Sequence, residues 1–398
     1  MKVLLVNHFP LTGSGSGVYT QNIANSLVKL GHEVMTVFPE NQDCDQNNKF
    51  AICPVFFTNE DEDAAKMEGA LPFNFPCFTT HPRSTKTFDS LTEEELALYV
   101  DAFRKATGKC VAEFNPDVIH CGHVWILAAI ACEFGVPVVI TSHGTDLMGI
   151  ENSPRFASFA QRAAEKCSAI ISISKGNLEL LNKVLPEQKN KFHLILNGFN
   201  DDVFYQCDVS RNEVLSSFGI DTRYSKVVSF AGKFAHFKGI DVLLRANAEY
   251  DAENIATILA GDGELFDEMS ALKEELKLKN TFFIHNQPHN KLRELYSIAD
   301  VSVVCSRNEP FGLVAIEAGA CGAPVVASNS GGLVDIIDAH TGLFFEQENS
   351  EELAACITSI LNGDVVFDRQ QVAQLTHNRF SQDTFTAKLV REIYEKVV

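Results

Sequence analysis

The segment Arg307–Ile337 joins two carboxylates to a predicted helix N-terminus. Glu309 precedes the turn Pro310-Phe311-Gly312, and Glu317 follows eight residues after Glu309. Proline suits the first helical position, so a helix that begins at Pro310 puts Glu317 about two turns in and leaves Glu309 in the loop at its mouth. We expect the two acids to bind different polyol groups of one ligand. The ligand's phosphate would lie on the backbone N–H groups of three successive residues, Phe311, Gly312 and Leu313.

A second set of residues suited to phosphate lies in the loop GKFAHFKG, which runs from Gly232 to Gly239. Lys233 and Lys238 precede a predicted helix that begins near Ile240. Cations beside a helix N-terminus suit a diphosphate, although a solvated loop can carry the same residues.

The glycine-rich loop TGSGSG follows the first predicted strand and ends at Gly17. Gly15 and Gly17 let the backbone approach a phosphate closely, which predicts a second phosphate contact. A plain tight turn is the alternative. A dinucleotide site is disfavoured because Thr20 stands where its third glycine belongs.

Histidines follow two of the predicted buried strands. His143 and Asp146 come just after the strand VPVVIT, at the strand end where parallel sheets bind ligands. We expect His143 to be catalytic, bonding a sugar hydroxyl or a leaving phosphate, and Asp146 to lie on the acceptor side. A His–Asp pair that only orders the loop is the alternative. His120, in the motif HCGH, is also expected on the acceptor side, where it would line a cleft, and a structural histidine is the alternative. A zinc site is disfavoured because it would need more ligands at coherent spacing.

These residues are spaced along a chain in which strands alternate with helices. The pattern begins at Val3, restarts near Lys226 and predicts two parallel sheets covered on both faces. The helix from Leu91 to about Phe114 begins with the capping sequence Thr92-x-x-Glu95. The polar, proline-punctuated stretch 41–92 is predicted to be an insertion with loops, of which Cys44–Phe88 shapes the acceptor side.

Composition excludes several classes of protein. The formal net charge of −19 disfavours nucleic acid and anionic membrane surfaces as partners. The 11 cysteines are scattered without CxxC spacing, which indicates reduced thiols in the cytoplasm. The apolar start Val3–Val6 is too short for a signal peptide, and no window approaches the ~20 apolar residues of a membrane span. At most, weak peripheral membrane contact remains.

Taken together, the motifs resemble glycosyltransferase family four, the retaining enzymes with the GT-B fold. The resemblance covers nearly the whole chain: the glycine loop, DVIHCGH, TSHGTD, ILNGFNDDVF, FAGKFAHFKGIDVLL, AGDGEL and EPFGLVAIEAGACGAPVVASNSGGLVDII. It implies an α/β protein with two Rossmann-like parallel-sheet domains facing a central cleft. We expect residues 1–200, joined by the final helix 381–398, to form the acceptor-side domain and residues 201–380 to form the donor domain.

The resemblance also implies roles for single residues. Lys233 and Lys238 correspond to the diphosphate cations, Glu309 to the carboxylate that contacts the transferred sugar, and Glu317 to the ribose ligand. The glycine-rich strand ends that border the donor are matched by Gly232, Gly261, Gly263 and Glu264. The sequence departs from the family pattern in three places: Lys233 replaces a usual arginine, His285 replaces a usual glycine beside the base pocket, and Asn200 replaces a common aspartate in the linker motif.

The sequence therefore predicts a metal-independent, retaining glycosyltransferase without a cofactor. It would move a sugar from a nucleoside diphosphate sugar, UDP-sugar favoured and GDP-sugar next, to a hydroxyl on a small molecule, glycan or lipid-linked acceptor. Two alternatives stay open. One is a nucleotide-sugar epimerase or phosphorylase of the same fold, and the other is a non-catalytic protein that only binds sugar nucleotides.

Overall fold

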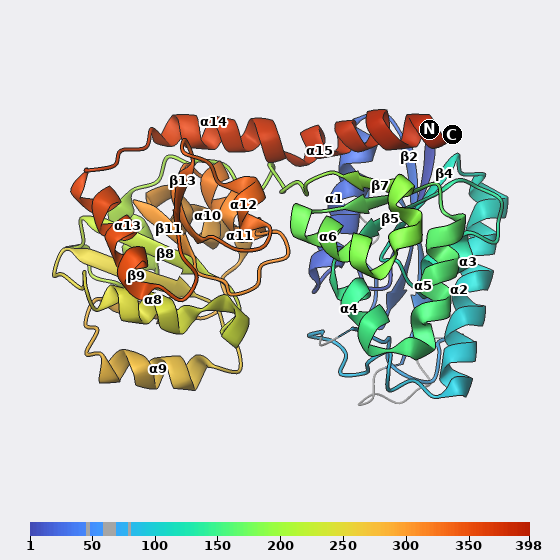
Figure 1. Cartoon of the computed structure of the whole chain (residues 1–398), viewed down its shortest axis with the longest axis horizontal. Helices are drawn as coiled ribbons and strands as arrows, with labels where there is room; N and C mark the ends of the chain where they lie inside the picture. The colour runs from blue at the N-terminus through green and yellow to red at the C-terminus, as the bar shows by residue number, and fades with distance from the viewer. Residues whose placement is uncertain (45–47, 59–68, 79–80) are drawn as a thin grey trace. The chain divides into compact units, whose positions relative to one another are not determined.

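The computed structural model describes residues 1–44, 48–58, 69–78 and 81–398. It divides the chain into one unit of Met1–Leu196 with Phe385–Val398 and a second unit of Asn197–Thr384 (Figure 1). Part of the predicted acceptor-side segment Cys44–Phe88 lies outside the described residues.

The first unit contains a seven-stranded sheet in which every pairing is parallel. Its strand order is β3-β2-β1-β4-β5-β6-β7, so the chain reverses its direction of winding next to β1. Such a reversal opens a crevice at the carboxyl ends of the strands, where ligands bind in open sheets. The strands are β1 Lys2–Val6, β2 Glu33–Glu40, β3 Ala51–Phe56, β4 Val118–Gly122, β5 Val138–Ser142, β6 Ala169–Ser172 and β7 Phe192–Leu194.

Helices cover both faces of this sheet (Figure 1). Alternate residues of a strand point to opposite faces: Leu4 packs in one apolar cluster with residues of α2, α3 and α5, while Leu5 packs in another with residues of α1 and the C-terminal segment. The helical segments are α1 Gly15–Lys29, α2 Glu93–Phe114, α3 Ile126–Ala131, α4 Thr145–Asn152, α5 Pro154–Lys166, α6 Lys175–Val184, the 3₁₀ turn η1 Pro186–Lys191, the part of α15 (Gln382–Leu389) from Phe385 onward, the π turn η3 Val390–Tyr394 and α16 Glu395–Val397.

The second unit has a six-stranded parallel sheet of order β10-β9-β8-β11-β12-β13. Its strands are β8 Lys226–Ala231, β9 Ile255–Ala260, β10 Thr281–Ile284, β11 Val301–Val304, β12 Val325–Ser328 and β13 Gly342–Phe345. Its helical segments are α7 Arg211–Ser217, the 3₁₀ turn η2 His236–Lys238, α8 Ile240–Asn247, α9 Phe266–Glu275, α10 His289–Ile298, α11 Leu313–Ala320, α12 Leu333–Ile336, α13 Ser350–Asn362 and α14 Arg369–Phe380.

The prediction of two parallel α/β sheets is confirmed, and so is the capping box of α2, in which Thr92 and Glu95 bond each other's backbone N–H groups. The sequence analysis gave no strand within the predicted insertion 41–92, where the structure has β3 at the edge of the sheet. Pro54 stands within β3, and an edge strand tolerates a residue that cannot donate to the ladder. The short strand β13 was also missed.

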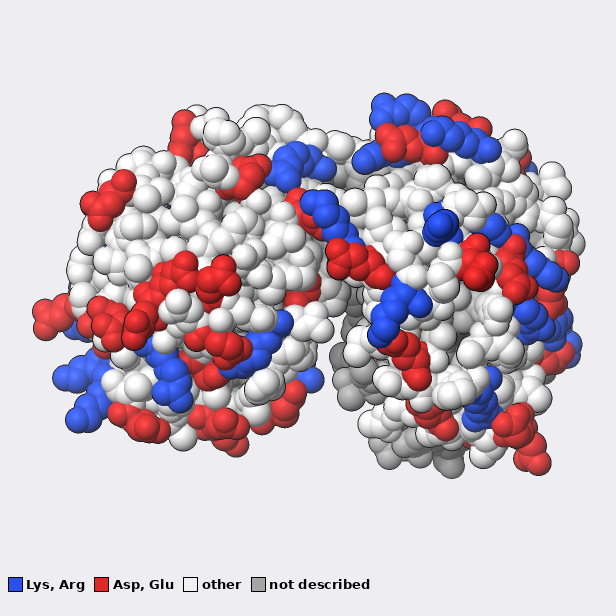
Figure 2. All heavy atoms as spheres, viewed as in Figure 1, with Lys and Arg blue, Asp and Glu red and all other residues white. Residues whose placement is uncertain are grey.

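Among the described residues, no helix is both long and apolar enough to cross a membrane. On the face shown in Figure 2, Asp and Glu side chains are interleaved with Lys and Arg over the described part of the chain. The prediction that nucleic acid is not a partner rests on the net charge of −19.

Candidate functional site

The turn between β11 and α11 sets the position of Glu309. The prediction that α11 begins at Pro310 is wrong: its first residue is Leu313. Gly312 has φ 109°, a left-handed conformation that interrupts the helix and that favours glycine. Gly331 and Gly332 pack against this turn without side chains, and the Gly332 N–H donates to the Glu309 carbonyl at 2.8 Å.

The Glu309 carboxylate is buried and shared by two donors. Its Oε2 accepts from Lys238 Nζ at 2.6 Å and from the Ser306 hydroxyl at 3.0 Å, and Glu309 is only 8% exposed. Charge-assisted bonds of this kind fix both side chains in one geometry. The structure therefore brings together Lys238 and Glu309, which the sequence analysis assigned separately to diphosphate and sugar.

Arg307, to which the sequence analysis gave no role, anchors the loop that carries Lys238. Its guanidinium forms a two-bond contact with Asp241, at 2.9 and 2.7 Å, and donates to the His236 carbonyl at 2.6 Å. Gly239, at φ 64°, lies so close to the Cys305 carbonyl that a side chain would collide with it. These contacts hold the loop against the end of β11. In the sequence, the features that could have indicated them are Arg307 just after a strand and Gly239 at the end of the loop.

Glu317 lies one turn into α11, not two, because the helix begins later than predicted. The residue is only partly exposed, and burial raises the pKa of its carboxyl to about 7, against the opposing effect of the Lys238 charge. Within the described residues, the structure records no hydrogen bond or ion pair of this carboxylate. It also records none for the N–H groups that open the helix, those of Phe311, Gly312 and Leu313.

The remaining predicted donor residues lie at the ends of three neighbouring strands, β8, β9 and β10. Lys233 and Glu264, both substantially exposed, form an ion pair of 2.9 Å. His285 Nδ1 lies 2.6 Å from an Asp262 oxygen, and its ring stacks on Phe266. The glycines at these strand ends make backbone-to-backbone approaches that a side chain would block: Gly261 meets Gly232, and Gly263 meets Phe234.

The predicted phosphate loop of the N-terminal unit is partly helical. Helix α1 begins at Gly15, with Ser14 as its N-cap, so Gly15 and Gly17 lie in its first turn and not in a loop. Gly17 has no room for a side chain, because a Cβ would collide with the Pro10 carbonyl. Packing against Pro10 therefore explains why position 17 is a glycine, and the contact of Gly17 with phosphate stays a prediction.

The structure gives His120 and Asp146 contacts inside the N-terminal unit, which favours the structural alternative for both, and their assignment to the acceptor side stays a prediction. His120 is 3% exposed, and both ring nitrogens are bonded inside the unit, Nδ1 to Tyr394 at 2.5 Å and Nε2 to the Thr141 hydroxyl at 2.8 Å. Asp146 is 0% exposed, and its carboxylate accepts from three backbone N–H groups, those of Val124, His143 and Gly144. Asp146 thus orders the loop that carries His143.

His143 itself stands at the end of β5 between two rings. The centroid of the His143 ring lies 4.8 Å from the ring centroid of Tyr19 and 4.8 Å from that of His123. Burial and the neighbouring His123 lower the pKa of His143 to about 3, so the imidazole is neutral at physiological pH. A neutral imidazole can exchange hydrogen bonds with a hydroxyl, whereas it offers no charge to a phosphate.

The buried histidines predict acid sensitivity of the fold. Burial lowers the pKa of His8, His120, His123 and His143 below the usual 6.5. Below pH 6.5 the unfolded chain therefore binds protons that the folded chain does not. Each such histidine lowers the free energy of unfolding by about 1.4 kcal/mol per pH unit. Urea titrations at pH 7, 6 and 5 measure this loss, and His120→Gln should reduce its slope. A stability that does not change between pH 7 and 5 would contradict these pKa shifts.

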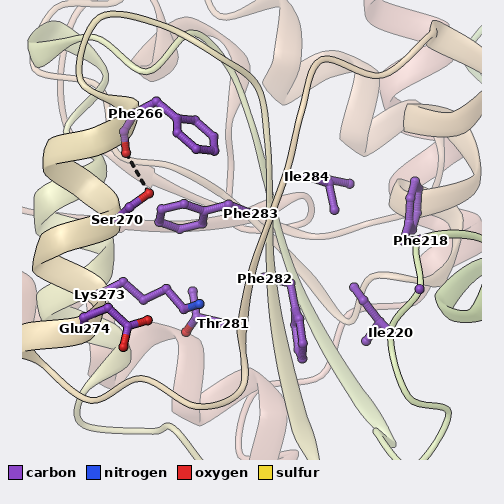
Figure 3. Close-up of a pocket in the computed structure, with 11 residues that line it drawn as sticks. Phe218, Ile220, Phe266, Ser270, Lys273, Glu274, Thr281, Phe282, Phe283 and Ile284 are labelled. Carbon is purple, nitrogen blue, oxygen red and sulfur yellow. Dashed lines mark hydrogen bonds between the residues drawn. The ribbon is translucent and has the colours of Figure 1, made fainter.

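A pocket of about 350 Å³ lies elsewhere, beside the edge strand β10 (Figure 3). Phenylalanines are among the residues that line it, including Phe218, Phe282 and Phe283, and the Ser270 hydroxyl donates to the Phe266 carbonyl at 2.8 Å beside it. None of the predicted site residues lines this pocket. The described residues also contain no group of three or more His, Cys, Asp or Glu side chains placed to hold a metal ion.

Comparisons with known proteins agree on one family. Residues 13–203 match the family model described as Glycosyltransferase Family 4, and residues 217–378 match the model described as Glycosyl transferases group 1. An uncharacterised glycosyltransferase of Methanocaldococcus jannaschii is 25% identical over 389 residues, which cover 91% of this chain and 89% of that protein. Alpha-maltose-1-phosphate synthase of Mycolicibacterium smegmatis is 28% identical over 309 residues, 70% of this chain and 79% of the relative.

A solved structure matches the whole chain. The crystal structure of HepE from Anabaena in complex with UDP is similar with a TM-score of 0.75 at 18% identity, covering 99% of this chain and 100% of that one. At this identity the likeness concerns the fold.

Proposed function

The chain belongs to the group 1 glycosyltransferases of family 4 and has their GT-B fold, and we propose that it transfers a sugar from a nucleoside diphosphate sugar to a hydroxyl acceptor. The observation that carries the proposal is the buried Lys238–Glu309 contact near the start of α11. The same helix bears Glu317, whose carboxylate has no recorded partner among the described residues. A UDP-sugar is the favoured donor because HepE was crystallised with UDP and with UDP-glucose, and a GDP-sugar is the next candidate.

Each part of the donor has a matching group in the C-terminal unit. The diphosphate would contact Lys233, Lys238 and the N–H groups that open α11, close to glycine backbone at the ends of β8 and β9. The ribose would donate both hydroxyls to Glu317. The base would lie near His285, and the transferred sugar would contact Glu309.

We propose that transfer retains the configuration of the sugar. As the donor bond breaks, negative charge grows on the leaving diphosphate and positive charge on an oxocarbenium-like sugar. Prepositioned N–H groups and lysines stabilise the diphosphate, and each ~1.4 kcal/mol of such selective stabilisation is a tenfold gain in rate. The Glu309 carboxylate, already fixed by Ser306, opposes the charge on the sugar. The neutral His143 would form a hydrogen bond with a hydroxyl of the sugar.

Turnover should not require a divalent ion, because the lysines and the helix N-terminus supply the positive potential at the phosphate. In about 5 mM EDTA, the rate of nucleoside diphosphate release is expected to match the rate without EDTA within about twofold. Loss of turnover in EDTA and its return with magnesium or manganese would contradict this prediction.

Thermal unfolding with UDP, GDP, ADP and their sugar conjugates tests the proposed function. A ligand at 100 times its dissociation constant adds about 2.7 kcal/mol of stability. The nucleoside diphosphate of the natural donor and its sugar conjugate should therefore raise the unfolding temperature more than the other ligands do. An epimerase would instead convert the donor without an acceptor, and a phosphorylase would consume free phosphate. A protein that only binds donors would show the thermal shift without donor hydrolysis.

A further inference from the structure

Two cysteines of the N-terminal unit, Cys53 and Cys110, lie on neighbouring elements with their thiols in contact. Cys53 stands in β3, where it packs with Val55 in the apolar cluster that contains α2 residues, while Ile52 packs in the cluster on the opposite face of the sheet. Because side chains alternate along a strand, Cys53 points toward α2. Cys110 is one of the buried residues of α2, and the two thiols form a hydrogen bond.

The two thiols differ in their access to solvent. Cys110 is 2% exposed, whereas Cys53 is partly exposed and lies on β3, the edge strand of the seven-stranded sheet. A reagent that arrives from the solvent therefore meets Cys53 first, with Cys110 behind it.

The hydrogen bond also decides which sulfur is ionised. It lowers the pKa of Cys53 to about 7, against the opposing effect of burial. The charge of Lys109 lowers this pKa as well and that of Glu113 raises it, while Val37, the neighbour of Cys53 on β2, is apolar. The same hydrogen bond raises the pKa of Cys110, which keeps its proton. Since the thiolate is the reactive form of cysteine, Cys53 is the nucleophile of the pair.

We propose that Cys53 and Cys110 form a site of reversible oxidation, at which a hydroperoxide converts the two thiols to a disulfide between β3 and α2. Cys53 is the thiol that reacts with the peroxide, and Cys110 is the thiol that resolves the product. Neither residue belongs to the proposed donor contacts, so the site can be tested independently of the proposed function.

The oxidation runs in two steps. The Cys53 thiolate attacks one oxygen of hydrogen peroxide: a sulfur–oxygen bond forms, the oxygen–oxygen bond breaks, and the hydroxide that leaves takes a proton from the solvent. The Cys110 sulfur then attacks the Cys53 sulfenic acid: the sulfur–sulfur bond forms, the sulfur–oxygen bond breaks, and hydroxide leaves with the Cys110 proton as water. The two sulfurs lose two electrons in total, which reduce one peroxide to two waters. A dithiol reverses the reaction by exchange.

Peptide mapping of the folded full chain tests the site. The reduced protein is treated with hydrogen peroxide at pH 7, the remaining thiols are blocked with iodoacetamide, and the digest is analysed by mass spectrometry without reductant. We expect peptides joined through Cys53 and Cys110, and their separation by dithiothreitol. Cys356→Ser is the control that should keep this bond, because Cys356 is also partly exposed but its thiol donates to the Phe344 carbonyl at 3.6 Å and burial raises its pKa.

Two variants of Cys110 separate the steps. Cys110→Ser should stop the reaction after the first step, so that dimedone labels Cys53 as its sulfenic acid. In the wild-type chain, the rate at which iodoacetamide modifies Cys53 should reach half its maximum near pH 7. Cys110→Ala, which removes the hydrogen-bond donor, should move this midpoint up by about one pH unit or more.

The wild-type measurements decide the proposal even if a variant does not fold. It is overturned if peroxide oxidises other cysteines of the folded chain without joining Cys53 to Cys110, or if the two are joined only after urea has unfolded the chain. A wild-type alkylation profile centred at the usual cysteine value of about 8.5 would also overturn it.

Discussion

Glu309→Gln is expected to lower donor turnover by about 100- to 1000-fold while changing the affinity for free nucleoside diphosphate by no more than about threefold. Glutamine keeps the shape and can still bond Ser306, but it removes the charge that faces Lys238 at 2.6 Å and the developing positive charge on the sugar. Because the free nucleotide carries no sugar, only the transition state and the bound sugar lose an interaction.

Rates of nucleoside diphosphate release, measured beside calorimetric titration with the nucleotide, check this expectation. Glu294→Gln is a matched control, since Glu294 forms a 2.7 Å ion pair with Lys291 on α10, outside the proposed donor contacts. The assignment fails if Glu309→Gln turns over the donor at the wild-type rate, or if the variant loses nucleotide binding.

Glu317→Gln should fail in the opposite way, weakening both the free nucleotide and the nucleotide sugar by tenfold or more. A carboxylate that accepts two ribose hydroxyls makes charge-assisted bonds worth about 1.5–3 kcal/mol each, and an amide can accept through only one oxygen. Nothing else in the described residues holds the Glu317 carboxylate, so its pairing energy is available to a ligand.

The raised pKa of Glu317, about 7, adds a pH dependence. The ionised form binds the ribose, so the affinity for nucleotide sugar should fall about tenfold per unit as the pH drops below 7. Calorimetry with a nucleotide sugar at pH 8, 7 and 6 measures the slope, and Glu317→Gln should abolish it. An unchanged affinity in Glu317→Gln, together with lost nucleotide binding in Glu309→Gln, would reverse the placement of the donor along α11.

Much of the fold was predictable because its signals are local. The buried strands are short apolar runs, and the capping box of α2 lies within four residues of sequence. Strand β3 was missed because Pro54 and polar neighbours mask an edge strand, whose pairing with β2 is a tertiary contact. The start of α11 was misplaced because Gly312, at φ 109°, interrupts the helix, and a side chain at this position would collide with Leu333, which is distant in sequence.

The residues of the candidate site could be predicted where the residue type itself indicates the chemistry. They could not be predicted where contacts between distant parts of the chain determine which side chains are free to bind a ligand. The contact of Lys238 with Glu309 spans 71 residues, yet both were selected as donor ligands from the motif. His120 looked like a ligand in sequence, but Tyr394, 274 residues away, occupies its Nδ1.

The most direct test of the central claim is donor turnover by the wild-type chain. The nucleotide sugar selected by thermal shift is incubated with the protein, nucleoside diphosphate release is followed, and the anomeric configuration of the product is assigned by proton NMR before it mutarotates. We expect protein-dependent release of the diphosphate, an α-configured product and loss of both in Glu309→Gln. A protein that binds the donor but releases no nucleoside diphosphate from UDP-, GDP- or ADP-sugars, with or without hydroxyl acceptors, would contradict it.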